Sequence, residues 1–244
     1  MNPHATVSTA RRVLQQLRSD PRTLVLLLGV PCLLLALLHW VFDGSPQVFD
    51  RVGPVLLAVF PLTTMFVVTS VATLRERTSG TLERLLTLPI GKLDILVGYA
   101  LAFAVVALAQ TALVSALALG PLDLLVNGSP VLLVLVALLS ALLGNTLGLL
   151  VSAFAATEFQ AVQFLPAFIL PQLLLCGLFV PRSLMPRTLE LVSDVLPLTY
   201  VVEAMQRAVT VGSTSRTWTD LLVVAGCILG AVALGALTLR RRTP

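Results

Sequence analysis

Six long apolar segments separated by short polar ones run through the chain. Each is about long enough for a helix to cross a hydrocarbon core of roughly 30 Å. The predicted spans are 24–42, 55–74, 93–119, 131–154, 164–180 and 219–239. Pro, Gly, Asn and Asp fill the connections after the first and third spans, so we expect consecutive spans to be antiparallel neighbours. The pattern predicts an all-α, polytopic membrane protein, with residues 1–244 forming one transmembrane domain.

The segment before the first span, 6–23, mixes basic and apolar side chains. Arg11, Arg12, Arg18 and Arg22 stand among valines and leucines. This composition is typical of an amphipathic helix on an anionic membrane surface, and we expect an interfacial elbow helix here. The basic stretch is long for a signal peptide and no small-residue cleavage pattern follows the apolar run, so we expect the segment to be retained.

A polar loop, 75–92, connects the second and third spans. Within it three leucines recur at helical spacing between Gly80 and Pro89, which predicts a short amphipathic helix over 79–89. A helix this short is marginal in water and needs another surface to lean on. The residues alone leave two surfaces open, the membrane interface and a second protein.

The segment after the fifth span, 181–211, is neither short nor hydrophilic. Pro197 divides it into two half-apolar helices, and Glu203 and Arg207 in the second have the i, i+4 spacing that supports a helix. Two arrangements fit equally well. One is a re-entrant hairpin in the outer leaflet, and the other is a pair of helices lying flat on the outer surface.

Composition agrees with a membrane protein, since 57% of the residues are hydrophobic and 11% are charged. The 16 basic residues flank the spans, so they indicate membrane orientation and not nucleic-acid binding. With the N-terminus inside, eleven of them lie in inner segments, and the other five are Arg51, Arg182, Arg187, Arg207 and Arg216. This bias favours both termini in the cytoplasm, together with the 75–92 loop.

Nucleotide hydrolysis is not expected of this chain. Lys92 follows Gly91, but Leu86 and Leu93 stand where a phosphate-binding loop needs a glycine and a Ser or Thr. The two histidines and three cysteines have neither metal nor disulfide spacing, so we expect no metal site. Acidic residues lie in loops or near span ends, which argues against an enzyme site in the bilayer and weakens ion-coupled transport without excluding it.

Uncharged polar side chains mark several spans. Hydrogen bonding between helices is the commoner use of such groups, and lining a substrate path is the alternative. The candidates for a path are Thr63, Thr69, Ser70, Asn145 and Gln172. Two glycine pairs, Gly144 with Gly148 and Gly226 with Gly230, have the small-xxx-small spacing that allows close helix contact, within or between subunits.

Several of these segments resemble the permease subunits of ABC-2 type transporters, which include daunorubicin-type drug exporters and nodulation-factor and polysaccharide exporters. The resemblance rests on Glu76-Arg77, on the residues Ser79-Gly80-Thr81-Leu82-Glu83-Arg84-Leu85-Leu86, and on the segments 179–181 and 196–204. The order of elements matches as well, over nearly the whole chain. The Ser-Gly-Thr-Leu-Glu-Arg-Leu run at this location is a fairly specific signal.

The resemblance implies a permease that forms the membrane path as a homodimer or heterodimer. Energy would come from two copies of a separate ABC ATPase chain, which would bind ATP and Mg²⁺, with no cofactor in this chain. The helix 79–89 would be the coupling helix received by the ATPase, and the elbow helix would share the contact. The implied interface residues are Glu76, Ser79, Gly80, Thr81, Leu82, Glu83, Arg84, Leu85, Leu86, Arg11 and Arg18.

On the same resemblance the hairpin 181–211 would be a lid at the exit side, with the residues Pro181, Pro197, Tyr200, Glu203 and Arg207. Small outer loops fit export of an amphipathic or lipid-like molecule. Hydrophobic drug or antibiotic efflux is the first expectation, and glycolipid or polysaccharide export the second. A membrane scaffold or regulatory subunit and an ion-coupled secondary transporter remain as alternatives of another class. The expected location is the bacterial plasma membrane, with lipid as a neighbour and no nucleic-acid partner.

Overall fold

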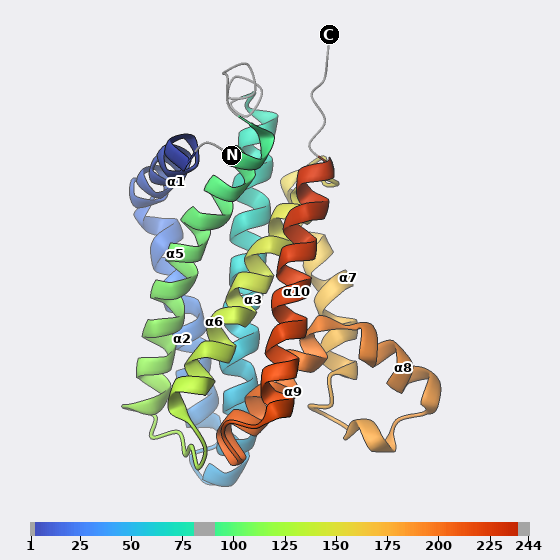
Figure 1. Ribbon diagram of the computed structural model, residues 1–244. Coiled ribbons are helices and arrows are strands. Elements are labelled where there is room, and N and C mark those ends of the chain that lie inside the picture. The colour runs from blue at the N-terminus through green and yellow to red at the C-terminus, as the bar shows by residue number, and fades with distance from the viewer. Residues whose placement is uncertain (1–2, 81–90, 239–244) are drawn as a thin grey trace.

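The computed structural model describes residues 3–80 and 91–238, and every regular element in these two ranges is a helix (Figure 1). The α-helices are α1 Pro3–Arg18, α2 Pro21–Val41, α3 Pro46–Thr78, α5 Lys92–Leu119, α6 Pro130–Ser152, α7 Glu158–Leu175, α8 Arg187–Val195, α9 Pro197–Thr210 and α10 Ser215–Thr238. A short 3₁₀ helix, Arg182–Leu184, precedes α8. Six of these helices are long and apolar enough to cross a membrane, which confirms the all-α, six-span prediction.

The long helices run side by side and give the bundle two distinct ends (Figure 1). Helix α1, the last turn of α3, the first turn of α5 and the last turn of α10 lie at one end, which we call the terminus end. The connections 42–45 and 120–129 lie at the opposite end together with the last turn of α9, and we call this the hairpin end. Helix α8 projects sideways from the bundle.

Polar caps and prolines define where several helices begin. The Asp20 carboxylate accepts a hydrogen bond from the Thr23 amide at 3.2 Å, and Pro21 then starts α2. Residues 19–23 therefore do not continue the elbow helix, and α1 ends at Arg18, before the end of the expected 6–23. Pro46 likewise starts α3 well before residue 55, so most of the expected loop 43–54 is helical.

The fifth long helix begins and ends earlier along the chain than the expected 164–180. The Thr157 hydroxyl accepts from the Gln160 amide at 3.2 Å and caps α7 at Glu158. Pro166 and Pro171 lie inside the helix, which ends at Leu175. Residues 176–180 therefore belong to the connection that leads into the 3₁₀ helix.

The centre of the bundle is the contact between α3 and α6, which glycines bring to backbone distance. A Cβ atom on Gly144 would lie 2.1 Å from the Leu62 carbonyl oxygen, and one on Gly148 would lie 2.6 Å from that of Phe66. This small-xxx-small pair packs within the chain. A Cβ on Gly226 of α10 would meet nothing within 4 Å among the described residues.

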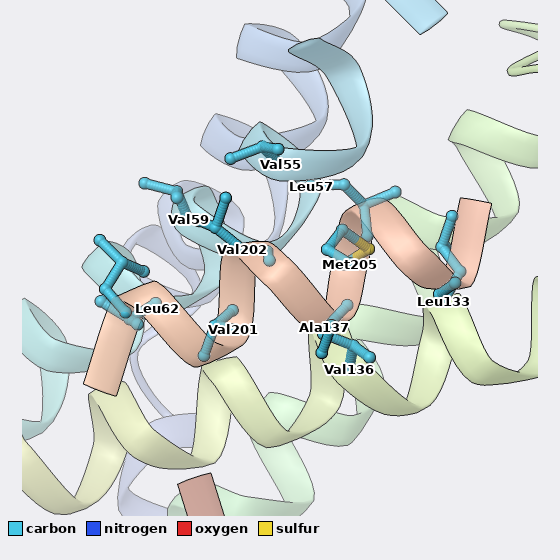
Figure 2. Close-up of a cluster of buried hydrophobic side chains, with 14 of the residues drawn as sticks. Val55, Leu57, Val59, Leu62, Leu133, Val136, Ala137, Val201, Val202 and Met205 are labelled. Carbon is cyan, nitrogen blue, oxygen red and sulfur yellow. The ribbon is translucent and has the colours of Figure 1, made fainter. Parts of the chain in front are cut away.

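Helix α9 completes this core at the hairpin end. Figure 2 shows Val201, Val202 and Met205 of α9 between apolar side chains of α3, such as Leu62, and of α6, such as Val136. All five side chains are almost fully buried. The hairpin end is therefore closed by apolar packing of α9 against the central pair.

A glutamine of α5 donates a hydrogen bond to a carbonyl of α2 that a proline leaves without its usual partner. Pro31 has no N–H, so the Leu27 carbonyl one turn earlier loses its usual partner within the helix. The Gln110 amide of α5 donates to this carbonyl at 2.7 Å and to the Thr64 hydroxyl of α3 at 2.7 Å. Because the bilayer offers no water to a freed carbonyl, the glutamine both satisfies α2 and ties three helices together.

Adding one methyl group tests the central contact. We expect Gly144→Ala to destabilise the protein by roughly 1–3 kcal/mol, because the new Cβ forces α3 and α6 apart. Denaturation of the purified protein in mixed micelles measures this change. Gly226→Ala is the matched control, since its Cβ enters open space, and equal stability of the two variants would contradict the contact.

A double-mutant cycle tests the role of Gln110. Gln110→Leu should cost about 1 kcal/mol in the parent, in the range of hydrogen bonds between membrane helices. In a Pro31→Ala background the Leu27 carbonyl regains a backbone donor, so the same substitution should cost less. If Gln110→Leu lowers stability equally in the two backgrounds, measured by the same denaturation, Gln110 does not compensate for the donor that Pro31 lacks.

Candidate functional site

At the terminus end, the last turn of α3 is tied to the two helices that follow α5. The Arg75 guanidinium meets the Glu158 carboxylate of α7 with Nε 2.9 Å from Oε1. Both side chains are more than half exposed, so this pair contributes little by itself. Arg77 donates to the Ser152 carbonyl at the end of α6. The end of α3 is therefore anchored on two sides.

The residue between these arginines, Glu76, joins α3 to α1 and α5. The Arg12 guanidinium of α1 binds the Glu76 carboxylate with both Nη atoms, at 3.2 and 3.0 Å. The same guanidinium donates to the Tyr99 hydroxyl of α5 at 2.8 Å and lies 5.8 Å from the centroid of its ring. Only 30% of the Arg12 side chain and 15% of that of Glu76 are exposed, so water screens this pair less than a surface pair. We call Arg12, Glu76 and Tyr99 the terminal clamp.

Helix α1 lies against α5 through one face. Thr9 and Val13 are buried on this face, and Thr9 packs directly on the α5 backbone at Gly98. The opposite face presents Arg11 and Arg18, which are exposed and form no ion pair or hydrogen bond with the residues that the structure describes. Two of the predicted interface arginines are thus free to meet another surface.

The predicted coupling helix begins where α3 ends. The Ser79 hydroxyl donates to the Glu76 carbonyl at 3.2 Å, and Gly80 follows with φ +73°, a left-handed conformation that suits glycine and terminates a helix. The remaining predicted interface residues, Thr81, Leu82, Glu83, Arg84, Leu85 and Leu86, lie outside the described residues. The coupling role stays a prediction, and what the structure adds is the clamp between the two helices that flank this segment.

Two of the path candidates form hydrogen bonds between helices. The Thr69 hydroxyl of α3 donates to Asn145 Oδ1 of α6 at 3.3 Å, and Asn145 Nδ2 donates to the Ala100 carbonyl of α5 at 3.0 Å. Both side chains are fully buried within this chain. Their geometry is that of packing contacts between three spans.

The other three candidates bond to backbone groups, two of them in their own helix and one in a different helix. Thr63 and Ser70 donate to carbonyls of their own helix, at 2.9 and 3.0 Å. Gln172 Oε1 accepts from the amide of Leu198 in the first turn of α9 at 3.3 Å, so α7 caps the start of α9. The hydrogen-bonding use of these residues has direct support, and their lining of a path stays a prediction.

The two helices of the expected hairpin have different environments. Most of α9 is buried against α3, α6 and α10, whereas Ser193 is the buried residue of α8. Pro181 precedes the 3₁₀ helix and Pro197 starts α9. The Tyr200 hydroxyl donates to the Asp194 carbonyl at 2.6 Å and joins the two helices. Re-entry into a bilayer stays a prediction, but α9 does not lie on the outside of the bundle.

A network of charges holds α9 to its neighbours. Glu203 and Arg207 form the pair expected from their spacing, at 2.5 Å. Arg182, before α8, binds both Glu203 and Asp194, and Arg207 also binds Asp220 in the first turns of α10. Burial alone would raise the pKa of the Glu203 carboxyl, but hydrogen bonds and charge from both arginines outweigh it and hold that pKa below its ordinary value.

The sequence predicts one pair of this network, Glu203 with Arg207, but not the other three members. Arg182, Asp194 and Asp220 belong to three different elements, so no spacing along the chain relates them. The sequence does contain one signal, because the charged residue Asp220 lies at the edge of a predicted span. The structure shows that only 4% of this residue is exposed. A buried carboxylate at such a position needs a basic partner. Among the described residues, no group of three or more His, Cys, Asp and Glu could hold a metal ion.

Comparison with known proteins places this architecture in a family. A sequence model of the ABC-2 type transporter family matches residues 4–209. The chain is 24% identical over 204 residues to ABC transporter G family member 20 of Dictyostelium discoideum, an alignment that covers 82% of this chain and 28% of that protein. It is 28% identical over 152 residues to the probable multidrug ABC transporter permease YbhR of Escherichia coli (strain K12), which covers 62% of this chain and 41% of YbhR.

The chain spans less than half the length of either relative. The family match nevertheless runs from α1 to the end of α9, and so includes the terminal clamp and most of the charge network. Six apolar helices make the protein a multi-pass membrane protein. By this match, which covers most of its length, the chain belongs to the ABC-2 type transporter family.

Proposed function

We propose that the chain is the permease subunit of an ATP-driven exporter, working as a dimer with two copies of a separate ATPase. The observation that carries the proposal is the terminal clamp. Arg12, Glu76 and Tyr99 join α1 to the two helices, α3 and α5, that enter and leave the predicted coupling segment. A force on that segment would move the three helices as one unit.

The rest of the bundle offers a route for this movement. The backbone contact at Gly144 couples α3 to α6, and α9 packs on both at the hairpin end. Close-packed elements shift as rigid bodies because their side chains leave little room for independent movement. Closure of an ATP-bound partner at the terminus end would therefore tilt the central pair and displace α9 at the other end. In this scheme α9 is the exit-side lid.

This scheme places the terminus end in the cytoplasm of a bacterial cell and the hairpin end outside. The positive bias of the loops supports that orientation. The substrate we propose is a hydrophobic drug, antibiotic or lipid-like molecule. Support for this class comes from the apolar helices and from the similarity to a probable multidrug permease.

Reconstitution with the partner tests the function directly. The permease and the ATPase that co-purifies with it are placed in liposomes, and movement of a fluorescent hydrophobic drug is followed with and without ATP. We expect transport that depends on ATP. A scaffold would give no transport, and an ion-coupled carrier would give transport driven by an ion gradient without ATP.

One substitution in the coupling segment should separate ATP hydrolysis from transport. Leu85→Asp places a charge in the predicted ATPase contact, so we expect export to fall roughly tenfold or more, as for loss of a buried apolar anchor. Membrane insertion should be unchanged. Leu125→Asp, an exposed leucine in the 120–129 connection at the hairpin end, is the matched control and should retain export. Unchanged export in Leu85→Asp would count against the coupling role.

Reversing the charges of the terminal clamp tests how movement is transmitted. Arg12→Glu or Glu76→Arg alone should lower ATP-dependent export by about tenfold, since each leaves a half-buried charge beside a like charge. The double variant Arg12→Glu/Glu76→Arg should recover part of the loss because the pair is restored in reverse. If the double variant exports no better than the single variants, the clamp does not act through this ion pair.

A further inference from the structure

A cavity of about 630 Å³ lies at the hairpin end, apart from the clamp and the path candidates. Its walls come from the first turns of α3 and α10, the last turns of α9, and the connection that follows α7. Its volume is in the usual range for small-ligand sites. The coupling scheme gives this space no role.

Four arginines line the cavity, and two of them are committed to carboxylates. Arg182 binds Asp194 and Glu203, and Arg207 binds Glu203 and Asp220, so these pairs form a fixed wall. The Nε atom of Arg182 is nevertheless buried and has no hydrogen-bond partner among the described residues. The wall therefore retains one unused donor.

The other two arginines, Arg51 of α3 and Arg216 of α10, are exposed. Within the part of the chain that the structure describes, neither forms a hydrogen bond or an ion pair. Asp50, the acidic neighbour of Arg51, also lines the cavity and accepts a hydrogen bond from the Leu125 amide at 3.2 Å. The two guanidiniums are thus the cavity's uncommitted cations, with planar donors suited to phosphate or carboxylate oxygens.

The remaining lining indicates an amphiphile more than a free ion. Pro54, Cys176 and Val209 supply apolar surface beside the arginines. On the connection after α7, Phe179 and Val180 are exposed just before the segment that lines the cavity. Apolar side chains next to cations suit a ligand with a charged head and a hydrocarbon tail. Asp50 and Glu203 repel any anion. A ligand with a hydrocarbon tail gains apolar contacts that offset this repulsion, whereas a small anion does not.

We propose that this cavity binds the anionic headgroup, phosphate or carboxylate, of a membrane amphiphile, with Arg51 and Arg216 as the anion-binding side chains. The ligand is a lipid of the surrounding leaflet. The proposal goes beyond the transport function and does not depend on the ATPase.

Binding of short-chain lipids by the purified permease tests the proposal. In nonionic detergent, affinities are measured for dihexanoyl phosphatidylglycerol, for the zwitterionic dihexanoyl phosphatidylcholine with the same chains, and for inorganic phosphate. We expect phosphatidylglycerol to bind at least about tenfold tighter than phosphatidylcholine, as for charge-assisted hydrogen bonds. Arg51→Gln/Arg216→Gln should lose most of that preference, and its thermal unfolding should change little because neither side chain forms a hydrogen bond or an ion pair with the described residues.

Arg187→Gln is a control for the loss of a positive charge at the surface outside the cavity. Arg187 lies in α8, exposed and outside the cavity, so its loss should change the phosphatidylglycerol affinity less than twofold. Failure of the wild-type protein to prefer phosphatidylglycerol overturns the proposal, and so does an equal loss in the control.

Competition by phosphate alone, abolished in the double variant, would support an anion site that also takes the free ion. Absence of competition would support the amphiphile as the ligand. No ATPase is present, so a negative result here leaves the transport function to its own test.

Discussion

The backbone contact between α3 and α6 is the constraint on which the rest of the structure depends. In a bilayer, lipid tails are as apolar as leucine, so helices associate through close packing and hydrogen bonds and not through the hydrophobic effect. Gly144 and Gly148 let α6 approach the carbonyls of Leu62 and Phe66 directly. This close pair then presents a continuous surface to which α5 adds on one side and α9 on another.

Arginine is used in the same way at both ends of the bundle. At the terminus end Arg12 connects three helices through one carboxylate and one tyrosine, and at the hairpin end Arg182 and Arg207 connect α9 to its neighbours through three carboxylates. The planar guanidinium suits this use because it donates several hydrogen bonds at once and remains charged when half-buried. Close packing and uncharged hydrogen bonds therefore join the middle of the bundle, while charged hydrogen bonds join its ends.

Backbone groups that lack a partner within their own helix are satisfied by side chains of other helices. Pro31 frees a carbonyl inside α2, and Gln110 of a different helix donates to it. Gln172 similarly accepts from the first turn of α9, where helix amides have no partner of their own. The five polar side chains named as path candidates thus have hydrogen-bond partners among the described residues. In the proposed transport scheme, these hydrogen bonds join helices that tilt together, and α9 is displaced at the hairpin end.

Several properties of the protein were determined by the sequence alone. Six apolar runs of bilayer length predicted the all-α, six-span architecture, because a spanning chain must satisfy its backbone hydrogen bonds within helices. Helical spacing was enough to predict the Glu203 and Arg207 pair, since residues four apart lie on one helix face. The tertiary structure alone decided which glycine pair packs inside the chain, that Arg12 meets Glu76 and Tyr99, and that Arg182 and Asp220 join the hairpin network. The physical reason is distance along the chain: periodicity reports only on neighbours within one helix, whereas these contacts join helices whose relative placement depends on packing of the whole bundle.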